Sequence, residues 1–196
     1  MGALTRRSVA RGAPRILQAV VIALLFVVEA RAQPAPADAR TAESEIKAAF
    51  ISKFGNYVEW PTSGKTAAQT PFVIGALTDD AGARELAKAA AGRTVDGRPI
   101  VVRKLARGDR LDDIAILFVA RTNSGALAEM LAALKGRPVL TITESDEAIA
   151  AGSMVNFVVV DDRVRFDIGL QAAEQSSLKI SGRLLALARK ISGAPS

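Results

Sequence analysis

Short apolar runs alternate with helical segments through the middle of this chain, and this alternation limits the possible folds more than any other feature. Strands are predicted at residues 72–77, 100–102, 114–119 and 139–142. Helices are predicted at residues 84–91, 125–134 and 147–150. Strands that are apolar along their whole length are typical of a parallel sheet buried on both faces. The sequence therefore predicts an α/β fold, a mostly parallel sheet with helices on both faces.

The end of the chain predicts a hairpin followed by a long helix. Residues 155–160 and 164–168 are separated by three polar residues, a spacing that suits an antiparallel pair of strands. In the second strand apolar and charged residues alternate, as expected where one face lies in water. From residue 170 to residue 191, apolar residues recur at helical spacing, which predicts a long C-terminal helix packed on the sheet.

The first 32 residues have the three parts of a cleavable secretion signal. Four arginines precede an apolar stretch at residues 16–28, and Ala30-Arg31-Ala32 forms a small-x-small cleavage site. The apolar stretch is shorter than the roughly 20 residues that a membrane-spanning helix needs. We therefore expect a signal peptide at residues 1–32 that is cleaved near Ala32. The general and the twin-arginine export routes both stay open.

The remaining chain is expected to form one domain after a short linker. Residues 33–40 are rich in proline and alanine, which predicts a flexible linker. Ile46, Phe50 and Phe54 recur at the spacing of one helix face, so an amphipathic helix should open the fold. Residues 41–192 have the length of a single domain.

Charge and composition exclude several classes of function. The leader holds five of the 26 basic residues and one of the 20 acidic residues. The remaining net charge is only about +2, with no basic run, so nucleic acid is not an expected partner. The chain contains no histidine and no cysteine. Histidine-dependent catalysis and the usual zinc sites are therefore excluded, and we predict no catalytic residues, no metal, no cofactor and no enzyme activity.

Two stretches of the sequence carry a recognisable pattern. The first contains Lys47-Ala48-Ala49-Phe50 and Val58-Glu59-Trp60-Pro61. The second contains Gly152-Ser153-Met154-Val155-Asn156-Phe157, Val164-Arg165-Phe166-Asp167-Ile168 and Leu178-Lys179-Ile180-Ser181. In this order, over residues 43–191, they resemble the YfiR-like periplasmic regulatory proteins, also described as YfiR/HmsC-like.

This resemblance implies a periplasmic regulatory protein. The best understood members of the family bind the extracytoplasmic part of an inner-membrane diguanylate cyclase and hold it inactive. Release of the cyclase raises cyclic di-GMP and favours biofilm formation. The implied partner is therefore a membrane-bound diguanylate cyclase or another sensor protein. Family members often carry disulfide-forming cysteines, and because this chain has none, redox sensing through thiols is excluded.

Four residues in these stretches are predicted to contact the protein partner, namely Trp60, Phe157, Arg165 and Lys179. Aromatic and cationic side chains of this kind are common in binding hot spots. Each also has a plain structural alternative. Phe157 can belong to the core, and Arg165 and Lys179 can lie on an exposed face.

A second hypothesis is a periplasmic small-molecule-binding domain. Open α/β sheets bind ligands outside the carboxyl ends of their parallel strands. The predicted strands end near Asp79, Arg121 and Thr143, although Asp79 is also well placed to cap a helix. Protein binding and ligand binding can coexist in one sensor. A homodimer also stays open.

Overall fold

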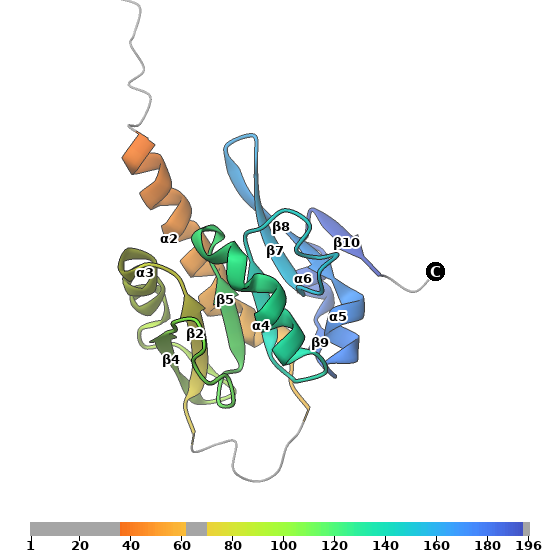
Figure 1. Cartoon of the computed structure of the whole chain (residues 1–196). Coiled ribbons are helices and arrows are strands. Elements are labelled where there is room, and N and C mark those ends of the chain that lie inside the picture. Colours follow the sequence, from red (N-terminus) through yellow and green to blue (C-terminus); the bar gives the residue numbers. More distant parts are fainter. Residues whose placement is uncertain (1–35, 62–69, 194–196) are drawn as a thin grey trace, which may run out of the picture. The chain divides into compact units, whose positions relative to one another are not determined.

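The computed structural model describes residues 36–61 and 70–193 (Figure 1). The predicted signal peptide at residues 1–32 and the first part of the predicted linker lie outside these residues. One sheet organises the described part, with the strand order β10-β8-β7-β6-β5-β2-β4-β3. Its strands are β2 (Phe72–Leu77), β3 (Thr94–Val95), β4 (Arg98–Lys104), β5 (Ile116–Val119), β6 (Leu140–Thr143), β7 (Val155–Val160), β8 (Arg163–Gly169) and β10 (Lys190–Ser192).

Helices and a second, small sheet surround these strands (Figure 1). The α-helices of the described part are α2 (Pro36–Phe54), α3 (Asp80–Ala90), α4 (Leu127–Leu134), α5 (Leu170–Gln175) and α6 (Gly182–Leu185). The 3₁₀ helices η1 (Gly55–Tyr57) and η3 (Arg121–Ala126) follow α2 and precede α4. The small sheet pairs β1 (Val58–Glu59) with β9 (Lys179–Ile180) in antiparallel orientation.

The topology confirms the predicted fold class. Strands β4, β2, β5, β6 and β7 run parallel to one another. Strand β8 returns antiparallel to β7 and closes the predicted hairpin, in which Phe157 lies opposite Phe166. Strand β10 then adds to β8 in parallel. The protein is thus an α/β fold with a mixed, mostly parallel sheet and a closing antiparallel hairpin.

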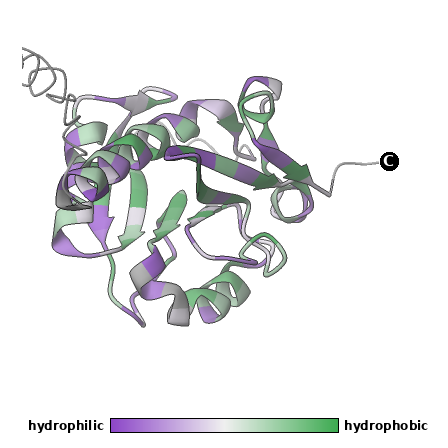
Figure 2. Cartoon of the chain, turned by 90° about the horizontal axis from the view of Figure 1, so that it is seen from above, coloured by the Kyte–Doolittle hydropathy of each residue, from purple (hydrophilic) through white to green (hydrophobic). Residues whose placement is uncertain are grey.

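Apolar clusters cover both faces of the sheet, because consecutive residues of a strand point to opposite sides. On one face, Phe50 and Phe54 of α2 meet Phe157 and Phe166 of the hairpin, and the ring centroids of Phe54 and Phe166 lie 5.3 Å apart. On the other face, the leucines of α4 pack against β2 and β5. Figure 2 shows helices on either side of strands that are mostly hydrophobic.

The segment after the hairpin differs from its prediction. In place of one long C-terminal helix, the chain forms α5, β9, α6 and β10. Ser177 has a φ of +57°, which an α-helix does not allow. Ser181 then caps α6 by accepting a hydrogen bond from the backbone N–H of Leu184. Beyond α6, the N–H of Arg189 donates to the carbonyl of Phe166, which joins this segment to β8.

Two shorter segments also differ from prediction. Residues 147–150 form turns instead of a short helix, because Glu147 has a φ of +61°. Helix α2 begins at Pro36, inside the segment predicted as a linker. Proline fits the first turn of a helix, since the N–H that it lacks would have no helical partner there.

Gly169 gives a direct test of the packing at the end of β8. A Cβ atom at this position would lie 2.7 Å from the carbonyl oxygen of Ser153, whereas a Cβ at Gly182 would meet nothing within 4 Å. We therefore expect Gly169→Ala to lower the free energy of unfolding by about 1–3 kcal/mol, the usual cost of overpacking. Gly182→Ala, the matched control, should leave it unchanged or raise it. Urea unfolding of both variants measures the difference. Equal stability of the two would contradict this packing.

Candidate functional site

A groove lies between the end of the β7–β8 hairpin and the chain that follows α6. It has a volume of about 670 Å³. Its charged lining residues are Arg163, Arg165, Arg189 and a single carboxylate, Asp161, and its larger apolar ones are Val160 and Leu187. We call this feature the hairpin groove. In Figure 1 the hairpin extends beyond the neighbouring strands, beside β10.

The hairpin groove combines exposed apolar side chains with guanidinium groups. Leu187 is 61% exposed, the highest value among the large hydrophobic residues that stand out from the described surface. Arg189 is fixed by Asp167, with Nε 2.8 Å from Oδ1. The hydrogen bonds and the negative charge of Asp167 raise the pKa of Arg189 above its ordinary value, so this guanidinium stays charged. Arg163 and Arg165 form no ion pair within the described part of the chain. The groove can therefore accept an apolar side chain flanked by carboxylates.

The four predicted contact residues fall in three different places. Arg165 is exposed and lines the hairpin groove. Lys179 is exposed on β9, where it lies opposite Glu59 in the small sheet. Trp60 follows β1 and is half-buried against Phe72, with ring centroids 5.2 Å apart. Phe157 is 1% exposed and belongs to the aromatic core under the hairpin. The structure thus places Trp60 and Lys179 at the small sheet and Arg165 in the groove.

A second hollow lies where the order of the parallel strands reverses. From β2 the chain passes through α3 to β4 on one side, and β5 then lies on the other side of β2. A pocket of about 190 Å³ opens beside the carboxyl ends of β2 and β5. Its charged lining residues are Arg40, Glu43, Lys47, Asp79, Arg121 and Glu144. We call it the switch-point pocket.

Lys47 and Glu144 form a buried ion pair in the switch-point pocket. Their side chains are 8% and 11% exposed, and Lys47 Nζ lies 3.1 Å from Glu144 Oε1. Lys47 also pairs with Glu43, one helical turn earlier on α2. The second carboxylate oxygen of Glu144 accepts a hydrogen bond from the backbone N–H of Arg121. This cluster joins α2 to the ends of β5 and β6.

Two of the three residues predicted near a ligand line this pocket. Asp79 and Arg121 do so, and Asp79 also caps α3 by accepting a hydrogen bond from the N–H of Gly82. Thr143 does not, because its buried hydroxyl bonds to Ser153 and Asn156. Lys47 and Glu144 were not predicted as site residues from the sequence. The sequence did contain a signal for Lys47, because this charged residue lies on the apolar face of the first helix, four residues after Glu43.

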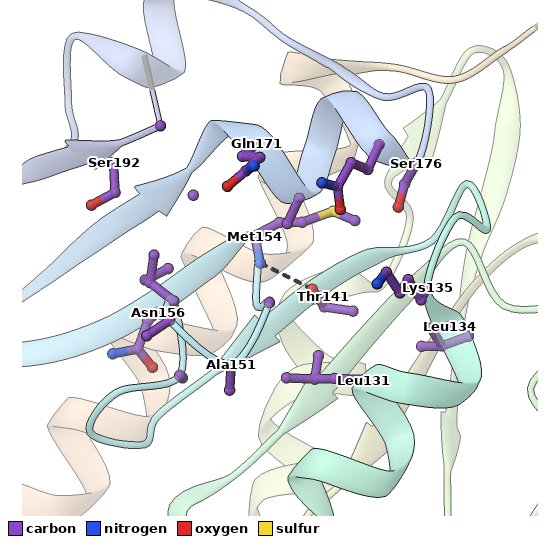
Figure 3. A pocket seen from close by; sticks show the side chains of 18 of the residues that line it. Leu131, Leu134, Lys135, Thr141, Ala151, Met154, Asn156, Gln171, Ser176 and Ser192 are labelled. Carbon is purple, nitrogen blue, oxygen red and sulfur yellow. Dashed lines mark hydrogen bonds between the residues drawn. The ribbon is translucent and has the colours of Figure 1, made fainter. Parts of the chain in front are cut away.

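A third hollow lies over β6, β7 and β8, between α4, the turns at residues 147–152 and α5 (Figure 3). Its volume is about 970 Å³. Thr141, which lines it, accepts a hydrogen bond from the backbone N–H of Met154 at 3.0 Å. Asn156 accepts hydrogen bonds from Thr143 and from the N–H of Ser145. These hydrogen bonds hold the turns onto the sheet. Because the polar groups of Thr141 and Asn156 are hydrogen-bonded, their burial has a structural explanation.

Metal sites and membrane spans are two further features to consider in the described part of the chain. Within residues 36–61 and 70–193, no group of three acidic side chains is arranged to hold a metal ion. Over the same ranges, no helix is long and apolar enough to cross a membrane.

The strand order and the closing hairpin define this protein as a mostly parallel α/β domain, with a cationic, partly apolar groove at the hairpin end. The chain belongs to the YfiR/HmsC-like family, whose model matches residues 44–189. Membership in this family indicates a regulatory protein in signalling. The family assignment therefore agrees with the resemblance found in the sequence.

A solved structure has a similar fold. It is the crystal structure of a conserved domain protein from Vibrio cholerae O1 biovar El Tor strain N16961, with a TM-score of 0.50 and 14% sequence identity. The match covers 76% of this chain and 60% of that chain. At this identity the likeness concerns the fold alone. No curated protein sequence matches the chain.

Proposed function

We propose that this protein is a periplasmic inhibitor that binds the extracytoplasmic domain of an inner-membrane signalling protein, a diguanylate cyclase, and so controls cyclic di-GMP output and biofilm formation. Family membership supports the regulatory role. The secretion signal expected at residues 1–32 supports action in the periplasm. The observation that carries the proposal is the hairpin groove, because it offers a binding surface on a chain without histidine or cysteine.

The chemistry of the hairpin groove suits a protein partner. Leu187 offers an exposed apolar anchor, and Arg163 and Arg165 stand beside it without an ion pair among the described residues. Arginine is enriched in interfaces, and apolar anchors surrounded by polar groups carry most of the binding energy. The proposed partner surface therefore has an apolar residue with acidic neighbours.

The small sheet provides a second proposed contact. Trp60 and Lys179 lie on neighbouring segments there, and the indole Nε1 of Trp60 is buried without a hydrogen-bond partner among the described residues. A partner carbonyl that reaches this group would relieve the cost of its burial. Phe157 is not kept in the proposed contact surface, because it supports the hairpin from the core.

Inhibition requires only that the protein prefer one state of the cyclase. A ligand shifts a two-state equilibrium by its difference in affinity for the two states. If the hairpin groove binds the inactive state more tightly, cyclic di-GMP synthesis falls, and release of the protein restores it.

Site-specific crosslinking in living cells tests this proposal. A photoreactive amino acid is placed at Leu187 in the groove, and in a control at Val101, which is 45% exposed on β4 and outside the groove. We expect position 187, but not position 101, to crosslink to an inner-membrane protein that carries a diguanylate cyclase domain. The proposed surface would be contradicted if neither position crosslinked to such a protein. It would also be contradicted if both positions crosslinked to it equally.

A further inference from the structure

We infer that the switch-point pocket binds a small zwitterion, an α-amino acid with a short apolar side chain. This function goes beyond partner binding and needs no partner for its test. The location comes first. Ligands of open α/β sheets bind outside the carboxyl ends of the strands, at the point where the strand order reverses. In this sheet that point lies between β2 and β5, and the pocket opens there.

The charges around the pocket balance. Three cations, Arg40, Lys47 and Arg121, face three carboxylates, Glu43, Asp79 and Glu144. Lys47 is already held by two of these carboxylates. Arg40 and Arg121 have no ion pair among the described residues, and the carboxylate of Asp79 has only its capping bond to a backbone N–H. Two free cations and one free anion therefore line the pocket, and a zwitterion requires one group of each sign.

The floor of the pocket is apolar. Ile51 of α2, Leu86 of α3 and Phe118 of β5 line it, and all three are buried. A ligand with a carboxylate and an ammonium group at one end would place an apolar side chain against them. Such burial favours binding without a further polar contact. The mixture of an apolar wall and a few placed polar groups is typical of small-molecule sites.

The volume limits the size of this ligand. Sites for drug-sized molecules occupy roughly 300–1,000 Å³, whereas the switch-point pocket has about 190 Å³. A dinucleotide or a sugar chain would not fit. An amino acid such as valine matches both the size and the charge pattern.

Lys47 and Glu144 give the pocket a fixed wall. Removing two charges from water is costly, and a buried ion pair is weak evidence for stability alone. Here the pair holds α2 against the end of β6, and Glu144 also accepts a hydrogen bond from the backbone N–H of Arg121 at the end of β5. The wall therefore fixes the backbone at Arg121 before a ligand enters, which lowers the entropic cost of binding.

Calorimetry with three matched compounds tests this inference. L-valine has both charges, 3-methylbutanoate lacks the ammonium group and isobutylamine lacks the carboxylate. The purified mature chain is unfolded, dialysed and refolded first, so that any bound compound is removed. We expect L-valine to bind, and each analogue to bind more weakly by roughly tenfold or more, since each loses one charged contact. Equal binding of 3-methylbutanoate would indicate a plain anion site and overturn the inference. No heat from L-valine, alanine or leucine would also overturn it.

Three variants place the binding in this pocket. Arg121→Gln removes one of the two free cations but keeps the backbone N–H that bonds to Glu144. Asp79→Asn removes the free anion and retains a good helix cap. Each variant should bind L-valine more weakly than the wild type by roughly tenfold or more. The circular dichroism spectrum of each variant should be unchanged. Arg183→Gln, on α6 and outside the pocket, should bind as the wild type does. Binding that is unaffected by the first two variants would place the ligand elsewhere and contradict the inference.

Discussion

Replacing Lys47 with methionine is expected to lower the free energy of unfolding by about 3 kcal/mol. Removal of one member of a buried ion pair typically costs about 3–5 kcal/mol, because the remaining charge stays buried without its partner. Glu144, whose side chain is 11% exposed, would lose its ion pair and keep the hydrogen bond from the backbone N–H of Arg121. Methionine has nearly the volume of lysine, so the packing of α2 against the sheet is otherwise preserved.

A matched control lies six residues further along the same helix. Lys53 is exposed on α2, and Lys53→Met should change the free energy of unfolding by no more than about 0.5 kcal/mol. Urea unfolding at neutral pH compares both variants with the wild type. A loss at Lys47 no greater than that at Lys53 would show that the ion pair does not hold α2 to the strand ends.

Replacing Leu187 with aspartate is expected to weaken binding of the cyclase domain by a factor on the order of 30 to 1,000, the range for loss of a hot-spot residue. The substitution removes the apolar anchor of the hairpin groove. It also places a carboxylate beside Arg163 and Arg165, where it would compete with the acidic groups of the partner. The fold should be unaffected, because Leu187 is 61% exposed.

Val101→Asp is the control for this substitution, since Val101 is also exposed but lies outside the groove. Titration of the purified extracytoplasmic domain against both variants, by calorimetry or biolayer interferometry, gives the two affinities. If Leu187→Asp binds as tightly as Val101→Asp, the hairpin groove is not the contact surface.

The sequence predicted the parallel part of the fold well because burial on both faces leaves a plain pattern. Strands such as β2 and β5 are apolar at nearly every position, and only a sheet covered on both sides buries such runs. The region after Gly169 could not be predicted in this way. Its apolar residues match helical spacing, but Ser177 adopts a left-handed conformation that breaks the helix. Backbone conformation at a serine is set by tertiary contacts, which a spacing pattern does not include.

The hairpin groove was not predicted, because residues 170–191 were expected to form one long helix. As part of one long helix, Leu187 would have faced the sheet, whereas α6 ends at Leu185 and leaves it exposed. Asp79 and Arg121 were predicted near a ligand from the topology rule alone, and both line the switch-point pocket. The Lys47 and Glu144 pair was missed, because the two residues are 97 positions apart and only the folded chain brings them together.

Cyclic di-GMP in the native bacterium tests the proposed function most directly. The gene is deleted and then restored with either the wild-type sequence or Leu187→Asp, and immunoblots of the periplasmic fraction establish that both proteins reach equal levels. We predict that deletion raises cyclic di-GMP, that the wild type returns it to its original level and that Leu187→Asp does not. An unchanged level on deletion, under conditions where the wild-type protein is present, would contradict the proposed regulation of a diguanylate cyclase. Full restoration by Leu187→Asp would contradict the role of the hairpin groove.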